Sequence, residues 1–507
     1  MASIKRIRRW PKGVGGGLVL WLVLGVTAAT GLAADWEPSP TERSKWIAEG
    51  RISPKVMDRL QSEPRVRVMA VFEEPLSRAA ATETQRFSAI QKSGDRLVEK
   101  LPLDAAVLRH RFQSVPALAL DVSWRALATL ASDPTVVRID LDEGGRGGLA
   151  QALPLVGGDT LQALGFSGSG VQVAVIDSGI DSDHPALAGQ VIAERCFCSG
   201  GGGCCPGGTS DESGLGSAED DHGHGTNVAG IVGATGVVAG PGLAPYVDLI
   251  SVKVLDSSNS FCCTSDVIAG LDWIVTDRPD VDVVNMSLGT WALYSGDCDT
   301  ANASTLAFTS AISALRHRGV LTTVSSMNDG SETSMASPAC ISGAISVGAV
   351  WDANLGGAGA NGCWDQSTAA DQITCFSNRN AQTDLFAPGA RITSAGLGGG
   401  LSTYSGTSQA APMVTGCVAL MKAVAPGLTA QDIENALESS PITVSDVATD
   451  LSFPRLECLD AARRLDLLNR IGKPVPLLGL WGRWLLVAAL GVPVAGVVKL
   501  WRRARAE

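Results

Sequence analysis

Three short segments of the sequence carry side chains that together could cleave an amide or ester bond. Asp177 ends an apolar run, His224 opens the segment His-Gly-Thr-Asn-Val-Ala-Gly, and Ser408 lies in Gly-Thr-Ser-Gln-Ala-Ala-Pro. A serine hydroxyl is a weak nucleophile at neutral pH, so it needs a histidine to accept its proton and a carboxylate to orient that histidine. The three segments therefore predict a serine hydrolase with Asp177, His224 and Ser408 as its catalytic residues.

The sequence around these residues predicts strands and helices that alternate along the chain. Residues 171–176 are a continuous apolar run, which is typical of a strand buried on both faces of a parallel sheet. Small residues follow His224 and Ser408, and each would lie in the first turn of a helix, where free N–H groups favour negative charge. Further strands are predicted at 247–254, 281–287, 320–325 and 344–350, and further helices at 264–277, 302–318 and 409–424. This alternation predicts a doubly wound, mostly parallel α/β domain with its site at the strand ends.

Five motifs in the same order over residues 165–445 resemble those of the subtilisin-like serine proteases. They are the three segments above, residues 284–289 (Val-Asn-Met-Ser-Leu-Gly) and residues 386–389 (Phe-Ala-Pro-Gly). One motif would be weak evidence, whereas the ordered set is strong, and Asp, then His, then Ser is the order found in this family. The resemblance implies a serine endopeptidase that hydrolyses peptide bonds through an acyl-enzyme intermediate.

The resemblance also implies which residues hold the substrate. Asn328, which follows an apolar strand, would bind the oxyanion with its side-chain amide, together with the backbone N–H of Ser408. Three consecutive residues would pair with the substrate backbone as an added strand: Ser287, Leu288 and Gly289. The sequence departs from the family at Asn227, where a second histidine is common, and at Met327, where glycine is usual. Met327 is expected to narrow or reshape the primary specificity pocket.

Each motif taken alone has a simpler structural interpretation. Asp-Ser-Gly is more often a turn at a strand end, and Gly-Thr-Ser is more often a helix N-cap. His222 is predicted to be a loop residue, and His184 is predicted to shape the loop that follows Asp177. Residues 334–338 (Ser-Met-Ala-Ser-Pro) imitate a serine motif but have no preceding Gly-Thr. The catalytic interpretation is preferred because the motifs occur together.

The residues before the catalytic domain resemble the inhibitor propeptide of subtilases, a small α+β, ferredoxin-like domain. The pattern predicts strands at 65–72 and 136–141, helices at 83–100 and 124–131, and an apolar–polar segment near 107–121. The resemblance implies that this propeptide, residues 35–148, inhibits its own protease and is removed by it. The cut is expected near 140–151, in a glycine-rich stretch predicted to be flexible, which leaves residues 149–470 as the catalytic domain. The alternative is a permanent accessory domain.

Both ends of the chain carry patterns typical of targeting segments. Basic residues between positions 5 and 12, followed by the apolar residues 14–29, predict a signal peptide over 1–34, with an uncleaved membrane anchor as the alternative. Residues 484–500 are apolar and precede an arginine cluster, which predicts a transmembrane or sorting tail over 471–507 resembling those of exported bacterial proteins. The alternative for this tail is a buried amphipathic helix. The protein is therefore expected in the cell envelope or outside the cell, attached to the membrane if its tail is retained.

Composition limits the partners and the compartment. The net charge of −11 in 507 residues argues against a nucleic-acid partner. Twelve cysteines behind a signal peptide indicate an oxidising compartment and disulfides, although the pairing cannot be derived from the sequence. Six of them lie in loops expected beside the cleft: Cys196, Cys198, Cys204, Cys205, Cys262 and Cys263. Metal binding is the alternative for these loops, and Cys417 is expected to be a buried thiol or a disulfide.

No cofactor is expected for the chemistry. The resemblance leaves a structural calcium open, and the acidic residues 219–221 are interpreted either as ligands or as a solvated loop. The expected partners are protein or peptide substrates, the chain's own propeptide and the membrane. Two rival functions stay open: a catalytically silent module that binds peptides, and a membrane-held processing protease with few substrates.

Overall fold

The computed structural model describes residues 37–76, 81–142, 145–147, 153–238 and 240–470. The predicted signal peptide (1–34) and C-terminal tail (471–507) lie outside these residues. Within them, no helix combines the length and the hydropathy needed to span a membrane.

The N-terminal region (residues 37–142) is an antiparallel sheet with helices on one face. Its elements are α1 (Pro40–Ala48), α2 (Pro54–Ser62), β1 (Val66–Phe72), α3 (Glu83–Lys100), β2 (Ala106–Arg111), β3 (Ala117–Val122), α4 (Trp124–Ser132) and β4 (Val136–Leu141). The strands lie in the order β2-β3-β1-β4, and every pair is antiparallel. The order β1-α3-β2-β3-α4-β4 is that of a split βαβ, ferredoxin-like unit. The sequence pattern missed α1 and α2, and the segment near 107–121 is the hairpin β2–β3.

The sheet of the N-terminal region is buried on both faces. On β1, Val68, Ala70 and Phe72 pack in the core formed with the region's own helices. Met69 and Val71, which alternate with them, belong instead to a core that includes α7 (Thr264–Asp277) and α8 (Ala303–His317) of the following domain. The period of two along a strand therefore divides β1 between two cores.

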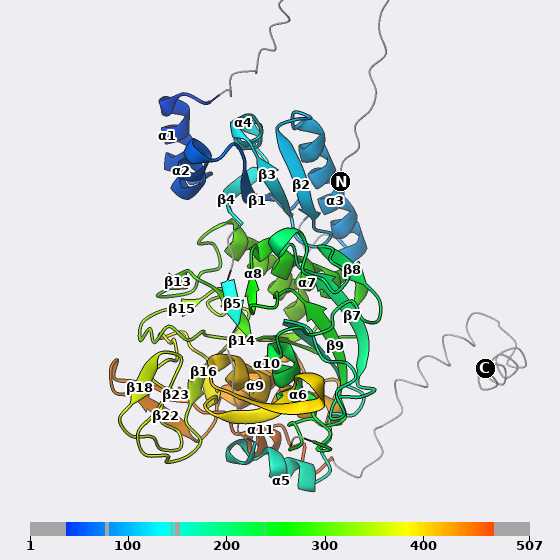
Figure 1. Cartoon of the computed structure of the whole chain (residues 1–507), viewed down its shortest axis with the longest axis vertical. Coiled ribbons are helices and arrows are strands. Elements are labelled where there is room, and N and C mark those ends of the chain that lie inside the picture. The colour runs from blue at the N-terminus through cyan, green and yellow to red at the C-terminus, as the bar shows by residue number, and fades with distance from the viewer. Residues whose placement is uncertain (1–36, 77–80, 143–144, 148–152, 239, 471–507) are drawn as a thin grey trace, which may run out of the picture. The chain divides into compact units, whose positions relative to one another are not determined.

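The second part of the chain is built on an eight-stranded sheet, shown in Figure 1. Its strands are β6 (Gln172–Asp177), β7 (Val191–Phe197), β8 (Asp211–Ser213), β9 (Asp248–Lys253), β11 (Val283–Met286), β14 (Leu321–Ser325), β16 (Ile345–Val350) and β19 (Leu385–Pro388). They lie in the order β19-β16-β14-β11-β6-β9-β7-β8, and only the β7–β8 pair is antiparallel. This is the predicted doubly wound, mostly parallel sheet.

Helices cover both faces of this sheet. Val173 and Val175 of β6 pack in a core with α6 (His224–Gly233) and α9 (Thr407–Val424), whereas Ala174 and Ile176 pack with α7 and α8. The smaller elements are η1 (Pro154–Val156), α5 (Gly158–Ala163), η2 (Gly200–Gly202), η3 (Leu397–Gly399), α10 (Ala430–Glu438) and α11 (Cys458–Arg464). Four two-stranded sheets complete the domain: β13 (Leu293–Tyr294) with β15 (Met335–Ala336), β17 (Ala358–Ala360) with β18 (Cys363–Asp365), β20 (Ile392–Gly396) with β21 (Gly400–Tyr404), and β22 (Thr443–Asp446) with β23 (Leu451–Pro454).

A short strand from the glycine-rich stretch lies between two strands of the second part of the chain. β5 (Gly145–Gly147, cyan in Figure 1) pairs antiparallel with β10 (Ser260–Phe261) on one side and β12 (Leu288–Thr290) on the other. The prediction that this stretch is flexible is therefore wrong for residues 145–147, because both edges of the strand are hydrogen-bonded. Residues 143–144 and 148–152 lie outside the described residues.

Candidate active site

Asp177 and His224 meet at the carboxyl end of β6. Asp177 is the last residue of the strand, His224 is the first residue of α6, and both are fully buried. His224 Nδ1 lies 2.5 Å from Asp177 Oδ1, which also accepts the backbone N–H of Ser178 at 2.7 Å. The close approach requires Gly225, since a Cβ there would lie 2.0 Å from the carbonyl oxygen of Gly179. A carboxylate in this place fixes one tautomer of the imidazole and leaves Nε2 to accept a proton.

A second carboxylate, Asp220, fixes the start of α6. Asp220 accepts hydrogen bonds from Ser178 Oγ at 2.8 Å and from the backbone N–H of Gly223 and Thr226, each at 2.9 Å. It therefore joins the residue after Asp177 to the helix that begins with His224. From the sequence, Asp220 is expected only as a calcium ligand or a loop residue, because a cap contributed from a loop gives no local motif.

The carboxylates on either side of Asp220 are also bound to protein groups. Glu219 accepts hydrogen bonds from the backbone N–H and hydroxyl of Ser182, and Asp221 lies 2.6 Å from the buried ammonium of Lys253. Lys253 Nζ also donates to the carbonyl of Ser178 at 2.7 Å. Calcium prefers carboxylates whose oxygens are available to it, so residues 219–221 do not fit a calcium site.

The two neighbouring histidines lie as the sequence analysis predicted. His184 is buried in the loop after Asp177, where its Nδ1 accepts the N–H of Ala186 at 3.0 Å and its Nε2 lies 2.9 Å from the carbonyl of Gly400. His222 lies in the loop before α6, with its ring centroid 6.4 Å from that of His224. Burial, and then the proximity of His224, lower the pKa of His222 from its ordinary value.

Ser408 lies in the first turn of α9 and is bound to the end of β11. Its Oγ donates to the carbonyl of Ser287 at 3.0 Å, and Ser287 Oγ donates to the carbonyl of Ser408 at 2.6 Å. Ser287 follows β11, the direct neighbour of β6 in the sheet. The nucleophile candidate is therefore fixed to the strand that leads into β12.

Asn328 lies beside the same helix start. Its Oδ1 accepts the backbone N–H of Thr407 at 2.8 Å, and Thr407 Oγ1 also lies within 3.1 Å of it. With its oxygen directed at Thr407, the amide presents Nδ2 as its donor. The backbone N–H of Ser408 is one residue further along the same helix start.

Asn227, where the family commonly has a second histidine, connects three elements. Its Nδ2 donates to Ser402 Oγ of β21 at 2.9 Å, and its Oδ1 accepts Gln409 Nε2 of α9 at 3.4 Å. Asn227 therefore fixes α6, which carries His224, against the helix that carries Ser408.

The serine-like segment at 334–338 opens no helix. Met335 and Ala336 form β15, which pairs with β13, and the bond between Ser337 and Pro338 is cis. The segment therefore has none of the helix N-terminal geometry found at Ser408.

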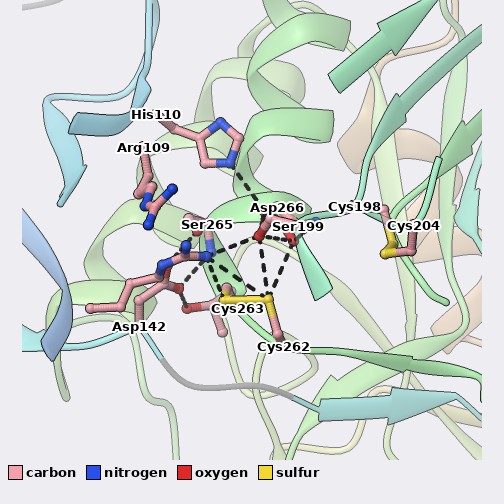
Figure 2. The surroundings of a disulfide bond; sticks show 12 residues. Arg109, His110, Asp142, Cys198, Ser199, Cys204, Cys262, Cys263, Ser265 and Asp266 are labelled. Carbon is pink, nitrogen blue, oxygen red and sulfur yellow. Dashed lines mark hydrogen bonds and ion pairs between the residues drawn. A yellow bond between two sulfur atoms is a disulfide. The ribbon is translucent and has the colours of Figure 1, made fainter. Parts of the chain in front are cut away.

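Three of the six disulfides lie in the loops at the end of β7 and directly after β10. All twelve cysteines are paired: Cys196–Cys205, Cys198–Cys204, Cys262–Cys263, Cys298–Cys340, Cys363–Cys375 and Cys417–Cys458. Cys196, Cys198, Cys204 and Cys205 are joined in disulfides, so their sulfurs are not thiolate ligands. The ligand atoms of Cys262, Cys263 and Asp266 lie within 4.8 Å of one another, so metal binding stays the alternative to the disulfide at that pair. Cys417 takes the disulfide alternative. Figure 2 shows the pair of adjacent cysteines, Cys262 and Cys263, with Ser199 and Asp266 beside it.

Carboxylates from both parts of the chain connect the N-terminal region to α7 and α8. Asp142 accepts Ser265 N–H at 2.7 Å and the hydroxyl of Thr264 at 2.8 Å, at the start of α7. Asp140 accepts the N–H of Ala303 at 2.6 Å, at the start of α8. Each carboxylate therefore faces the positive end of a helix.

Two carboxylates of α7, Asp272 and Asp266, contact the N-terminal region in turn. Asp272 accepts the N–H groups of Gln113 and Ser114, both at 2.6 Å. His110 Nε2 lies 3.0 Å from Asp266 Oδ1, as Figure 2 shows. Burial raises the pKa of Asp142 and of Asp272 above the usual range for a carboxylic acid.

The fold and this arrangement have the parts of a serine hydrolase built on a doubly wound α/β sheet. The model of the subtilase family matches residues 168–457. An extracellular serine proteinase from Thermus sp. (strain Rt41A) is 31% identical over 441 residues, covering 82% of this chain and 93% of that protein. Subtilisin E from Bacillus subtilis (strain 168) is 31% identical over 341 residues, covering 66% and 77% respectively. A solved structure of a cold-adapted subtilisin-like serine proteinase matches 58% of this chain and 90% of its own, with 28% identity and a TM-score of 0.43.

The family match covers more than half of the chain, and the Thermus relative is matched over nearly its whole length. The chain belongs to the subtilase family. It is a serine endopeptidase, and the reaction of this family requires no cofactor.

Proposed function

We propose that this chain is an exported subtilase that hydrolyses peptide bonds with Ser408, His224 and Asp177 and matures by removing its own N-terminal region. The observation that carries the catalytic part is the buried contact between His224 Nδ1 and Asp177 Oδ1. This contact lies at the carboxyl end of β6, whose neighbour in the sheet, β11, leads to Ser287. The carbonyl of Ser287 accepts the hydrogen bond of Ser408 Oγ. A buried Asp–His pair can also have a purely structural role. Here the hydroxyl of Ser408, in the first turn of α9, accompanies the pair, which favours a catalytic role.

The proposed reaction uses each of the four residues in a defined way. Ser408 Oγ attacks the carbonyl carbon of the scissile bond while His224 Nε2 takes its proton and then delivers it to the leaving amine. Asp177 orients His224 and stabilises the imidazolium. Asn328 Nδ2 and the N–H of Ser408 hold the oxyanion of the tetrahedral intermediate. The acyl-enzyme is then hydrolysed by water, which His224 deprotonates in turn.

In this proposal, the substrate backbone lies along residues 287–289. β12 offers its backbone groups to an added strand, and β10 offers a second edge opposite it. β5 already pairs with both edges in the uncleaved chain. This supports residues 35–148 as an inhibitory propeptide whose C-terminal end enters the groove, with residues 149–470 as the catalytic domain.

The hydrogen bonds of Asp140 and Asp142 with α8 and α7 support the same role for the N-terminal region. A region that caps two helices of the protease stabilises the protease as well as covering its groove. Six disulfides support maturation in an oxidising compartment. We propose that residues 1–34 direct export and that residues 471–507 act as a membrane-anchoring or sorting tail.

The test compares the mature N-terminus of the exported wild-type protein with that of Ser408→Ala. We expect wild-type protein that begins near residues 140–151, and a Ser408→Ala protein that retains residues 35–148. The substitution removes one oxygen atom at a buried position. The folding control is the circular dichroism spectrum of Ser408→Ala after its N-terminal region has been cut off in trans, which should match that of mature wild type.

The other outcomes are equally informative. An intact chain from residue 35 in both proteins, without labelling of the wild type by a fluorophosphonate serine probe, would contradict the proposed catalytic role. Cutting in both proteins together with such labelling would leave the catalytic role in place and assign maturation to another protease.

A further inference from the structure

Met327 is held in an unusual backbone conformation next to the site. It lies in the turn between β14 and Asn328 and is only 3% exposed. Its φ of 78° falls in the left-handed region, where glycine is favoured and where a larger residue persists only if its surroundings hold it. Its N–H donates to Thr407 Oγ1 at 3.0 Å. The turn is therefore fixed to the residue that precedes Ser408.

The side chain of Met327 packs against β12. A Cβ added at Gly289 would lie 2.6 Å from Met327 Cγ, 3.1 Å from its Sδ and 3.2 Å from the Cβ of Ala336 in β15. The first of these distances is shorter than real side-chain contacts, so the space beside Gly289, between β12 and β15, is already occupied by Met327. A flexible thioether is well suited to filling such a gap.

β5 indicates the course of a substrate strand through the groove. Gly145 lies opposite Thr290, Arg146 opposite Gly289, and Gly147 opposite Leu288, so the chain runs toward Ser287. The carbonyl of Ser287 accepts the hydrogen bond of Ser408 Oγ at 3.0 Å. A strand in this register therefore reaches the nucleophile one residue after the position of Gly147.

That next substrate residue must place its carbonyl carbon at Ser408 and its carbonyl oxygen at Asn328. The side chain of that substrate residue enters between β12 and the turn at residues 326–328, because Ser287 leads directly into β12 and Asn328 directly follows Met327. This is the space that Met327 occupies. In the chain's own sequence the residue after Gly147 is Gly148, a glycine without a side chain that lies outside the described residues.

We propose that Met327 makes this protease selective for glycine or alanine immediately before the scissile bond. The proposal rests on the proposed roles of Ser408 and Asn328. It also accounts for a methionine where the backbone favours glycine, since the side chain excludes bulky substrates by occupying their space. Forcing extra atoms into packed space disfavours the larger side chain by about 10- to 100-fold in kcat/KM.

The first experiment maps cleavage positions. The matured wild-type protein, Met327→Gly and Met421→Leu digest a denatured protein mixture, and mass spectrometry identifies the residue before each cut. Met421 is a buried methionine near the end of α9 and serves as the matched control. We expect wild type and Met421→Leu to cut after glycine and alanine, and Met327→Gly to gain about 10- to 100-fold in kcat/KM on peptides with leucine or phenylalanine at that position.

A fluorophosphonate serine probe separates the two ways in which the proposal can fail. A wild-type protein that reacts with the probe but prefers leucine or phenylalanine overturns this inference alone. A preference unchanged by Met327→Gly, in a variant that still reacts with the probe, also overturns it. A wild-type protein that neither reacts with the probe nor cuts any peptide overturns the proposed function, and this inference falls with it.

The second experiment uses the chain as its own substrate. Gly148→Phe is expected to slow self-processing at this junction by about 10- to 100-fold in the wild-type background. The double variant Gly148→Phe/Met327→Gly is expected to regain the rate of Met327→Gly alone. Equal processing of Gly148→Phe and wild type overturns the inference, as does a double variant as slow as Gly148→Phe.

Discussion

Two buried aspartates, Asp177 and Asp142, make similar contacts in different settings. Asp177 holds the imidazole of His224 and accepts the N–H of Ser178, all within the catalytic domain. Asp142 accepts the N–H of Ser265 at the start of α7, but it belongs to the N-terminal region. The partners of Asp177 would therefore remain after maturation, whereas those of Asp142 would be lost when the two parts separate. In the proposed function, one carboxylate serves the reaction and the other serves the inhibited state.

This difference predicts that substitutions at the two positions affect different measurements. Changes around Asp177 should act on kcat in the mature enzyme. Changes around Asp142 should act on the affinity between the N-terminal region and the catalytic domain. The following predictions test that division, beginning with the largest effect.

Asp177→Asn is expected to lower kcat by about 10,000-fold. The amide has nearly the same shape, but it favours the wrong tautomer of His224 and cannot stabilise an imidazolium, and comparable changes in other serine proteases have effects of this size. The measurement is peptide hydrolysis by protein matured in trans, with the enzyme concentration normalised by absorbance. Asp142→Asn, another Asp-to-Asn change, is the control and should retain wild-type kcat. A loss below about 100-fold in Asp177→Asn would mean that Asp177 is structural.

Asn328→Ala is expected to lower kcat by about 100- to 1000-fold with little change in KM. The side-chain amide is proposed to bind the oxyanion, which forms only after the substrate has bound. The measurement is steady-state kinetics on a peptide with glycine immediately before the scissile bond. The thermal unfolding temperature of the variant controls for the lost contact with Thr407. A raised KM at unchanged kcat would assign Asn328 to substrate binding instead.

Sequence patterns specify the proposed site residues more directly than they specify the surroundings of those residues. Asp177, His224 and Ser408 each lie in a local motif at the end of a strand or the start of a helix, so a short segment specifies both the residue and its position. The strands predicted at 247–254, 281–287, 320–325 and 344–350 match the structure to within a few residues, whereas β7 and β19 of the same sheet were not predicted. Asp220 was missed because its hydrogen bonds reach a helix from a loop of no distinctive pattern.

The contacts between the N-terminal region and the rest of the chain could not be predicted from the sequence, for a similar reason. Asp142 and Ser265 are 123 residues apart, and no local pattern connects them. The pairing of β5 depends on edges contributed by β10 and β12, so a glycine-rich stretch that is unstructured by composition becomes a strand. The cysteine pairs follow from distances in the folded chain, which spacing does not give.

Asp142→Asn is expected to weaken inhibition of the mature enzyme by the N-terminal region about 10- to 100-fold. Hydrogen bonds to a charged carboxylate at a helix start are stronger than those to a neutral amide, and an amide N–H group facing Ser265 N–H would be repelled. The inhibition constant of residues 35–148 added in trans is the measurement, because this region has a core of its own. Asp104→Asn, an exposed aspartate of the same region, is the matched control. An unchanged inhibition constant would mean that the apolar contacts of β1 with α7 and α8 dominate this interface.

The smallest effect is expected in the pH dependence of that inhibition. Burial raises the pKa of Asp142 in the uncleaved chain, whereas in the separated region its pKa returns toward 3.8. Between these two values the complex keeps a proton that the free region has lost, so inhibition should weaken as pH rises from about 4 and level off above the raised pKa. Asp272, whose pKa is also raised by burial, contributes with the same sign from the catalytic domain. The measurement is the inhibition constant from pH 4 to 8, and Asp142→Asn should flatten its dependence on pH. Inhibition that strengthens as pH rises would contradict this prediction. It would show that the start of α7 stabilises the ionised carboxylate of Asp142 by more than burial destabilises it, so that Asp142 acts mainly as a helix cap.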